Sequence, residues 1–462
     1  MDEYSKKVLR VGVLGCGDIF NSHSQAYPDH PYAVVIGFYD RIQVRAMAWY
    51  KRMKDFMDMV YEAYEDEDEE DLDEEELCLL EKVKLFKREA KVYNSAKDLI
   101  AACDVIDVCT PNYAHGPYAA WALKMGKSVM VEKPPARLSL ETQWIVDVAE
   151  KSKGFYQANE NFLWQAYVEK THEVVRQGQI GEIHELKTSL GHSGPSWGFN
   201  NHFLNPSLSG GGCMSDMGIH TIGLGYGILG KSYEVKDICA VQLKSGTIPE
   251  RTMRDSDGWN VYAIKRFLVE DDAITKVTMT DKTTGNEIPW LIESSWSRKM
   301  ESVEIIGEKG KLRLETNDRM QKFLAFYDTE DNRTEIALPP QGRDSHVLQC
   351  IEFCNRLLEK KPARVDHKWA HQMQMIISGT YYSWLKGYEA YRQENPRETM
   401  KLDAPPFEGT KISPADLDTY YQTFMDAQIP KTILLEDIVY DLMRPFTHHY
   451  FSPGKRYERE TD

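Results

Sequence analysis

Residues 8–20, "VLRVGVLGCGDIF", open with an apolar run that ends at a glycine. The run predicts a short buried strand, and the polar residues that follow the glycines begin a helix. A second apolar stretch, "AVVIGFYD" at 33–40, predicts the next strand. Strand, glycine turn, helix and strand together form a βαβ unit, which requires a parallel sheet.

The glycine turn has the composition of a dinucleotide-binding loop. Gly15 permits a tight turn, and Gly17 lets the backbone approach a pyrophosphate at the start of the helix. Asp40 ends the second strand, where its carboxylate can bind the ribose diol of adenosine and repel a 2′-phosphate. We therefore expect NAD in preference to NADP, although the adjacent Arg41 could accommodate a phosphate. Phe20 replaces the usual third Gly or Ala, so we expect looser packing of helix on strand.

The alternation of strands and helices continues through the first third of the chain. It predicts an N-terminal Rossmann domain, a doubly wound parallel sheet, over residues 1–157. A helical, acidic insertion at about 43–90 interrupts it. The further predicted elements are strands at 105–110, 128–133 and within "FYQANEN", and helices at 115–126 and 139–153.

Beyond residue 158 the sequence alternates apolar and polar residues, as in "ESVEIIGEKGKLRLET". This period of two predicts an α+β domain at 158–394 with an open, mostly antiparallel sheet. Helices are expected at 344–360 and 366–391. Residues 395–462 form a C-terminal extension with a helix predicted at 431–443.

Charge and composition exclude several classes of protein. The net charge of −16 argues against nucleic-acid and anionic-membrane partners. Twelve of the acids lie at 62–76, most simply as a solvated helical arm. The eight cysteines form no CxxC pattern and are typical of buried thiols in a reducing compartment. No stretch has the length of a membrane span or the character of a signal peptide, so we expect a cytoplasmic protein.

Two further stretches carry chemistry. "GGGCMSDMGIH" at 210–220 runs from three glycines into Asp216 and His220, which share one face of a helix at a spacing of four. Lys133 ends a predicted parallel strand in "VEKPPA", at the edge of the sheet where ligands bind. Taken alone, each is more often a surface residue than a catalytic one.

Together these motifs resemble the Gfo/Idh/MocA oxidoreductases, the glucose–fructose oxidoreductase and inositol dehydrogenase family. The resemblance covers about residues 8–390 and rests on "TPNYAHGPYAAWALKMGKSVMVEKPPA" followed by "GGGCMSDMGIHTI". It implies NAD-dependent oxidation of a secondary alcohol. In that scheme His220 is the general base, Lys133 stabilises the alkoxide and Asp216 orients the substrate hydroxyl or the histidine. The glycines would let the backbone pass close to the nicotinamide and the substrate.

The resemblance also supplies the sets of binding residues. The expected cofactor-binding residues are Gly15, Gly17, Asp18, Ile19, Asp40, Arg41, Thr110, Pro111, Asn112, His115, Glu132 and Lys133. The expected substrate-binding residues are Asn161, Trp164, Trp197, Asn200, Asp216 and His220. No third ligand with metal-site spacing accompanies these residues, so no metal is expected.

The substrate class is a sugar, an inositol or a glycoside, and three outcomes stay open. The chain could catalyse simple dehydrogenation, or a redox-neutral cycle in which a 3-keto sugar allows glycoside cleavage or epimerisation. A non-catalytic NAD-binding regulator is the third reading, although this chain retains both Lys133 and His220. We also expect a homo-oligomer, formed through the open sheet and through an ordered C-terminal arm whose aromatic residues, such as Phe407, would be costly to leave in water.

Overall fold

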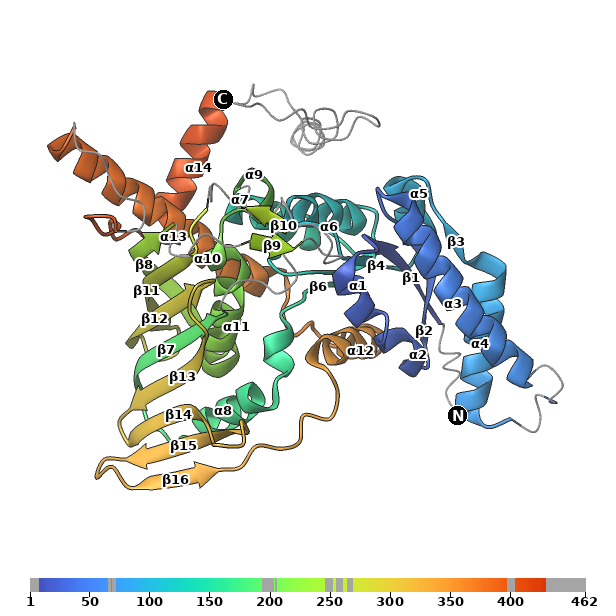
Figure 1. Ribbon diagram of the computed structural model, residues 1–462, viewed down its shortest axis with the longest axis horizontal. Coiled ribbons are helices and arrows are strands. Elements are labelled where there is room, and N and C mark those ends of the chain that lie inside the picture. The colour runs from blue at the N-terminus through green and yellow to red at the C-terminus, as the bar shows by residue number, and fades with distance from the viewer. Residues whose placement is uncertain are drawn as a thin grey trace. The chain divides into compact units, whose positions relative to one another are not determined.

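A computed structural model describes residues 8–64, 68, 72–192, 203, 206–245, 252–254, 261–263, 269–396 and 404–428. It divides into a large compact unit, Met1–Pro414, and a small one, Ala415–Asp462. Both domains foreseen from the sequence lie in the large unit (Figure 1). The predicted helix at 431–443 lies outside the described residues.

The N-terminal half is the expected parallel sheet. Its six strands, in spatial order, are β3 (Lys91–Val92), β2 (Ala33–Tyr39), β1 (Leu9–Leu14), β4 (Val105–Val108), β5 (Ser128–Val131) and β6 (Tyr156–Ala158). The helices that connect them are α1 (Asp18–His23), α2 (Ala26–Asp29), α5 (Ala96–Ala102), α6 (His115–Lys124) and α7 (Ser139–Ala149). All of these strands except β3 are almost completely buried, because helices cover both faces of such a sheet.

The register of the sheet brings the ends of its strands to one edge. Leu14, the last residue of β1, pairs with Tyr39 and with Val108. Val108 pairs in turn with Val131, and Val131 with Ala158. The turns that follow β1, β2, β4, β5 and β6 therefore leave the sheet side by side, at the edge where ligands bind in doubly wound sheets.

The acidic insertion is a helical hairpin of α3 (Gln43–Tyr64) and α4 (Glu74–Glu89). The buried Lys82 of α4 donates to the carbonyl oxygens of Tyr27, Pro28 and His30 at 2.7–3.1 Å, which fixes the hairpin to the end of α2. On α3, Trp49 meets Phe20 edge to face at 4.9 Å. Phe20 is thus fully buried under the insertion, as its size requires.

The second domain is built on a mixed sheet of eight strands. Only β7 and β12 are parallel neighbours; the other pairs are antiparallel, as expected. In spatial order the strands are β16 (Arg333–Ile336), β15 (Lys322–Asp328), β14 (Gly310–Thr316), β13 (Met300–Gly307), β7 (Ile183–Gly191), β12 (Glu287–Ser295), β11 (Asp272–Asp281) and β8 (Tyr233–Lys244). A separate pair consists of β9 (Thr252–Arg254) and β10 (Val261–Ala263).

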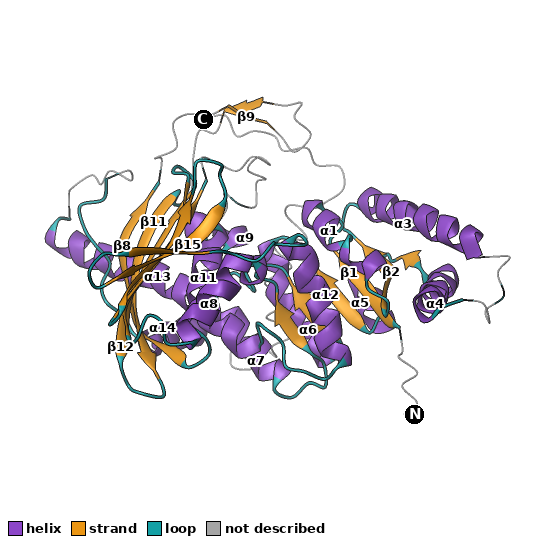
Figure 2. Cartoon of the chain, turned by 90° about the horizontal axis from the view of Figure 1, so that it is seen from below, coloured by secondary structure: helices purple, strands orange, loops and turns teal. Residues whose placement is uncertain are grey.

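The helices of this domain connect it to the Rossmann sheet (Figure 2). Helices α8, α11 and α13 pack against the eight-stranded sheet, α13 also contacts α7, and α12 contacts α1 and α2. The elements are η2 (Asn161–Trp164), α8 (Ala166–Arg176), α9 (Pro206–Ser209), α10 (Cys213–Asp216), α11 (Gly218–Leu229), α12 (Ser345–Leu358) and α13 (His367–Glu394). Among the described helices, none has both the length and the apolar character needed to cross a bilayer.

The start of the C-terminal extension packs on its own chain. Phe407 contacts the rings of Trp384, Tyr388 and Tyr391 on α13 at 4.4–5.9 Å. Ile412 forms an antiparallel bridge with β8. The first aromatic of the extension is therefore half-buried against its own chain, and assembly through the extension stays a prediction. The small unit contains α14 (Pro414–Gln428).

Candidate active site

The glycine turn and Asp40 meet as the sequence predicts. Gly15 has a φ of +94°, and a Cβ there would lie 2.5 Å from the carbonyl oxygen of Cys109, so only glycine fits. Among the described residues, apart from its two chain neighbours, none has an atom within 4 Å of a Cβ placed on Gly17. The Asp40 carboxylate accepts the Cys16 N–H at 2.8 Å and the Ile42 N–H at 2.7 Å. The acidic group is thereby held beside an open glycine turn.

Other expected cofactor residues surround this turn or the end of β4. Asp18 and Arg41 are exposed and Ile19 is half-buried. The hydroxyl of Thr110 is buried and has no hydrogen-bond partner among the described residues. Asn112, which follows Pro111, donates from its side chain to the Ser209 carbonyl oxygen at 2.9 Å.

His115 joins the turn after β4 to the turn after β5. Its Nδ1 and Nε2 lie 2.7 and 2.5 Å from the carbonyl oxygens of Pro134 and Thr110. The ring is almost completely buried. Pro134 follows Lys133 directly, so His115 helps to fix the turn that carries the lysine.

Lys133 and Asp216 form an ion pair between the two domains. Lys133 Nζ lies 2.8 Å from Asp216 Oδ1, and Asp216 Oδ2 accepts the Trp296 Nε1–H at 2.9 Å. Burial would lower the pKa of Lys133, but Asp216 outweighs it and raises that pKa above its ordinary value. Burial would likewise raise the pKa of Asp216, and Lys133 lowers it instead. Lys133 is therefore a cation at neutral pH, so it can stabilise an oxyanion but cannot accept a proton.

His220 is paired with a residue that the sequence did not indicate. Its Nδ1 lies 2.7 Å from Glu160 Oε1, and both side chains are buried. A carboxylate only accepts, so Nδ1 carries the proton and Nε2 is left with its lone pair. The ring of Phe162 lies 4.6 Å from the imidazole and fixes its plane. Asp216 was expected to orient either the substrate or this histidine, and the hydrogen bond to the histidine comes from Glu160.

The helix that carries Asp216 and His220 is broken in two. α10 ends at Asp216 and α11 begins at Gly218, with Met217 between them. The N–H of Met217 still bonds to the carbonyl oxygen of Cys213 at 2.8 Å, so the two side chains stay about one turn apart.

The three glycines before α10 approach protein groups. A Cβ on Gly210 would meet the backbone of Arg137, one on Gly211 the ring of Tyr381, and one on Gly212 the carbonyl of Glu270. The Glu270 carboxylate accepts the N–H groups of Gly212 and Met214, and Tyr381 Oη donates to it at 2.7 Å. Each of the three glycines therefore allows a close approach to a protein group at the start of the helix. That they also bring the backbone close to cofactor and substrate stays a prediction.

Two of the predicted substrate-binding residues, Asn161 and Trp164, contact protein side chains. Asn161 donates to Ser345 Oγ at 2.9 Å. The indole of Trp164 donates to Glu352 and lies under the guanidinium of Arg364. These contacts are with α12 and the loop after it. Trp197 and Asn200 lie outside the described residues.

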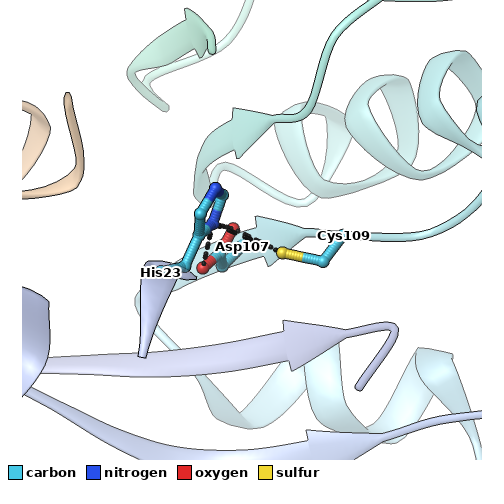
Figure 3. Close-up of side chains that lie close together, drawn as sticks. All are labelled: His23, Asp107 and Cys109. Carbon is cyan, nitrogen blue, oxygen red and sulfur yellow. Dashed lines mark hydrogen bonds and ion pairs between the residues drawn. The ribbon is translucent and has the colours of Figure 1, made fainter. Parts of the chain in front are cut away.

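The described residues bring together one group with the atoms of a metal site, His23, Asp107 and Cys109 (Figure 3). All three are buried, and their nitrogen, oxygen and sulfur atoms lie within 4.8 Å of one another. His23 Nδ1 lies 3.0 and 3.1 Å from the two oxygens of Asp107. These are hydrogen-bond distances, so a proton satisfies the group without an ion. The absence of a metal stays a prediction.

Known proteins match both domains. Residues 9–160 match the oxidoreductase family described by an NAD-binding Rossmann fold, and residues 168–313 match the GFO/IDH/MocA C-terminal domain. The D-glucoside 3-dehydrogenase of Escherichia coli (strain K12) is 32% identical over 307 residues, which are 64% of this chain and 81% of that protein. An alpha-N-acetylgalactosaminidase of Bacteroides fragilis is 30% identical over 109 residues, 22% of this chain and 25% of that one.

A solved structure resembles the whole fold. Levoglucosan dehydrogenase in complex with NADH and L-sorbose matches with a TM-score of 0.61 at 17% identity, covering 89% of this chain and 100% of that chain. At that identity the likeness concerns the fold.

Proposed function

Because the chain belongs to the GFO/IDH/MocA oxidoreductases, with their NAD-binding Rossmann domain, we propose that it oxidises a secondary hydroxyl of a sugar or glycoside. The observation that carries the proposal is the ion pair between Lys133, after β5, and Asp216, at the end of α10. About one turn beyond Asp216 lies His220, whose Nδ1 is hydrogen-bonded to the carboxylate of Glu160. This combination can take a proton and stabilise an oxyanion at the same edge of the sheet.

The residues at that edge fit NAD. Gly17 leaves open space at the start of α1, Asp40 presents a carboxylate beside it, and the buried hydroxyl of Thr110 has no protein partner among the described residues. These residues would hold the pyrophosphate, the adenosine ribose and the nicotinamide half respectively. When bound, NAD supplies the acceptor for the hydride that leaves the substrate carbon.

His220 would accept the hydroxyl proton at Nε2. Glu160 holds the ring with Nδ1 protonated and stabilises the positive charge that develops when Nε2 takes up a proton. The buried position of both side chains strengthens this interaction, because little water screens it.

Lys133 would stabilise the negative charge that develops on the substrate oxygen as its proton leaves. Asp216 keeps the lysine charged and orients its Nζ, and Trp296 fixes the second oxygen of Asp216. Glu160 and Asp216 thereby have separate tasks, one for the base and one for the cation.

For the substrate, the hydroxyl at C3 of a D-glucoside is the first candidate. This candidate follows from the similarity to the D-glucoside 3-dehydrogenase, which is 32% identical to this chain over 81% of that protein's length. The test is a panel of sugars, inositols and glucosides with NAD, followed at the absorbance of NADH, with His220→Gln as the control. NADH formation that the variant loses while it still binds NAD supports the proposal and excludes a non-catalytic regulator. A chain that binds no NAD in calorimetry would overturn it.

A redox-neutral cycle is the second candidate, favoured by the segment shared with an alpha-N-acetylgalactosaminidase. Oxidation at C3 would acidify the C2–H, so that loss of this proton would expel the glycosidic oxygen from C1 as an alcohol. Water would then add at C1, and the hydride first removed would reduce the ketone at C3 again. Product analysis after a single turnover separates the two. Net NADH with a keto sugar supports dehydrogenation, whereas cleaved glycoside without net NADH supports the cycle.

A further inference from the structure

The buried His23 links β4 to the turn after β5 that carries Lys133. His23 ends α1 and has no exposed surface. Its Nδ1 faces Asp107 of β4 at 3.0–3.1 Å, and its Nε2 faces Glu132 Oε1 at 3.0 Å (Figure 3 shows the first contact). Each ring nitrogen therefore points at a different carboxylate.

We propose that His23 is a positioning residue for Lys133: as an imidazolium, it clamps Glu132 to Asp107 and thereby fixes the turn that carries the lysine. Only a doubly protonated ring can donate to both carboxylates, since each of them only accepts. The connection to the lysine is short. Glu132 Oε2 accepts the backbone N–H of Lys133 at 3.2 Å, while its Oε1 is held by His23.

The charges around the ring favour this state. The titratable groups that face it are Asp107 of β4, Cys109 directly after β4, Glu132 directly after β5 and Cys350 of α12. Tyr27 of α2 donates to Asp107. Burial would lower the pKa of His23, but the acidic groups that face the ring outweigh burial and raise that pKa well above its ordinary value. Burial raises the pKa of the Cys109 thiol, so this thiol carries no charge at neutral pH.

The pKa of Glu132 is lowered, whereas that of His23 is raised. Burial would raise its pKa, but the hydrogen bond and the charge of His23 lower it to about 2. Glu132, the residue before Lys133, is thus an ionised carboxylate at neutral pH, and the positive charge of His23 compensates its negative charge. Without that balance Glu132 would be a buried, uncompensated anion next to the ion pair of Lys133.

A metal ion is the competing explanation for the same group. His23, Asp107 and Cys109 have the right atom types, and Glu132 on Nε2 would then be the outer carboxylate that often supports a metal-bound histidine. Against it, Nδ1 is at hydrogen-bond distance from both oxygens of Asp107, and Tyr27 Oη already occupies one of them at 2.7 Å.

The direct test is the protonation state of His23 in the purified wild-type chain, followed by NMR of nitrogen-labelled histidine. His23→Gln identifies the signal. We expect both ring nitrogens to stay protonated at pH values well above the ordinary histidine pKa. A ring with one proton, or one that titrates near its usual value, would overturn the proposal. So would a stoichiometric metal in elemental analysis. This measurement needs no substrate, so it does not depend on the proposed function.

The positioning role, which rests on the proposed function, is tested by kinetics. In His23→Gln we expect kcat to fall on the order of 10- to 100-fold, because small displacements of a catalytic group have effects of that size. The Kd for NAD should change less than about threefold, since Gly15, Gly17 and Asp40 keep their contacts. His30→Gln is the matched control: His30 is equally buried, bonds Asn355 at 3.1 Å and does not contact the lysine turn. Equal losses in both variants, or an unchanged kcat in His23→Gln, would refute the role.

Discussion

Replacing Glu160 by glutamine removes one charge behind the proposed base and little else. In the wild type Glu160 Oε1 lies 2.7 Å from His220 Nδ1, and both groups are buried. Two unit charges about 4 Å apart attract by about 4 kcal/mol at an effective dielectric constant of about 20. The amide oxygen of glutamine still accepts the Nδ1 hydrogen bond, so only part of this stabilisation is lost. We expect a loss of about 1.5–3 kcal/mol in the transition state, or roughly 10- to 150-fold in kcat.

The assay is the rate of NADH formation at saturating substrate, with the Kd for NAD measured separately. Glu160→Gln should lower kcat and leave that Kd nearly unchanged, because the base does not hold the cofactor. Glu160→Asp keeps the charge but retracts it by one methylene, so its kcat should lie between the two. A glutamine variant that folds, binds NAD and turns over within twofold of the wild type would refute the assigned role of Glu160.

Three further predictions follow from the same geometry. Lys133→Met should lower kcat on the order of 100- to 1,000-fold with a modest change in NAD affinity; collapse of that affinity with surviving turnover would instead make Lys133 a cofactor clamp. Gly17→Ala should leave the melting temperature unchanged, because no protein atom lies near the new methyl group, but should weaken NAD binding on the order of tenfold; unchanged binding in calorimetry would place the pyrophosphate elsewhere. Glu132 has a lowered pKa in the folded chain, so its ionisation contributes stability that is present above about pH 4.5 and is lost as the pH falls towards about 2. Acid unfolding of Glu132→Gln should therefore be less steep in that window than acid unfolding of the wild type, and parallel curves would contradict it.

The sequence predicts the Rossmann sheet well because its strands, except for the short edge strand β3, are buried on both faces. Such strands are unbroken apolar runs, and the turns after them end in glycine or polar residues at the ligand edge. The same pattern predicts that Lys133 and Asp40 lie at that edge. The meeting of Lys133 with Asp216, which are 83 residues apart, followed from the family resemblance.

The sequence does not predict which side chains pair with the proposed catalytic residues. Glu160 pairs with His220 across 60 residues, and Trp296 with Asp216 across 80. Both contacts depend on how the second domain packs against the Rossmann edge, and no local pattern encodes that. One sequence feature could have indicated Glu160 as a site residue. Like Asp40, it is an acidic residue in the turn after a parallel strand.

For the glycines at 210–212, the sequence predicts a close contact but not the group that makes it. A run of three glycines indicates a close approach of the backbone, but the sequence does not say what approaches. Here Tyr381 and Glu270, far along the chain, occupy the space that side chains would need. Phe407 is a similar case, since its apolar surface required burial and only the structure identified α13 as its partner.

The most direct test of the central claim is transfer of the hydride itself. A glucoside carrying deuterium on the carbon to be oxidised is incubated with the chain and NAD, and the cofactor is analysed by mass spectrometry after one turnover. We predict deuterium in the reduced cofactor and one keto group in the sugar at the same carbon, with neither formed by His220→Gln. Turnover that leaves no deuterium in the cofactor at any point of the cycle would contradict the assignment of this site as a dehydrogenase centre.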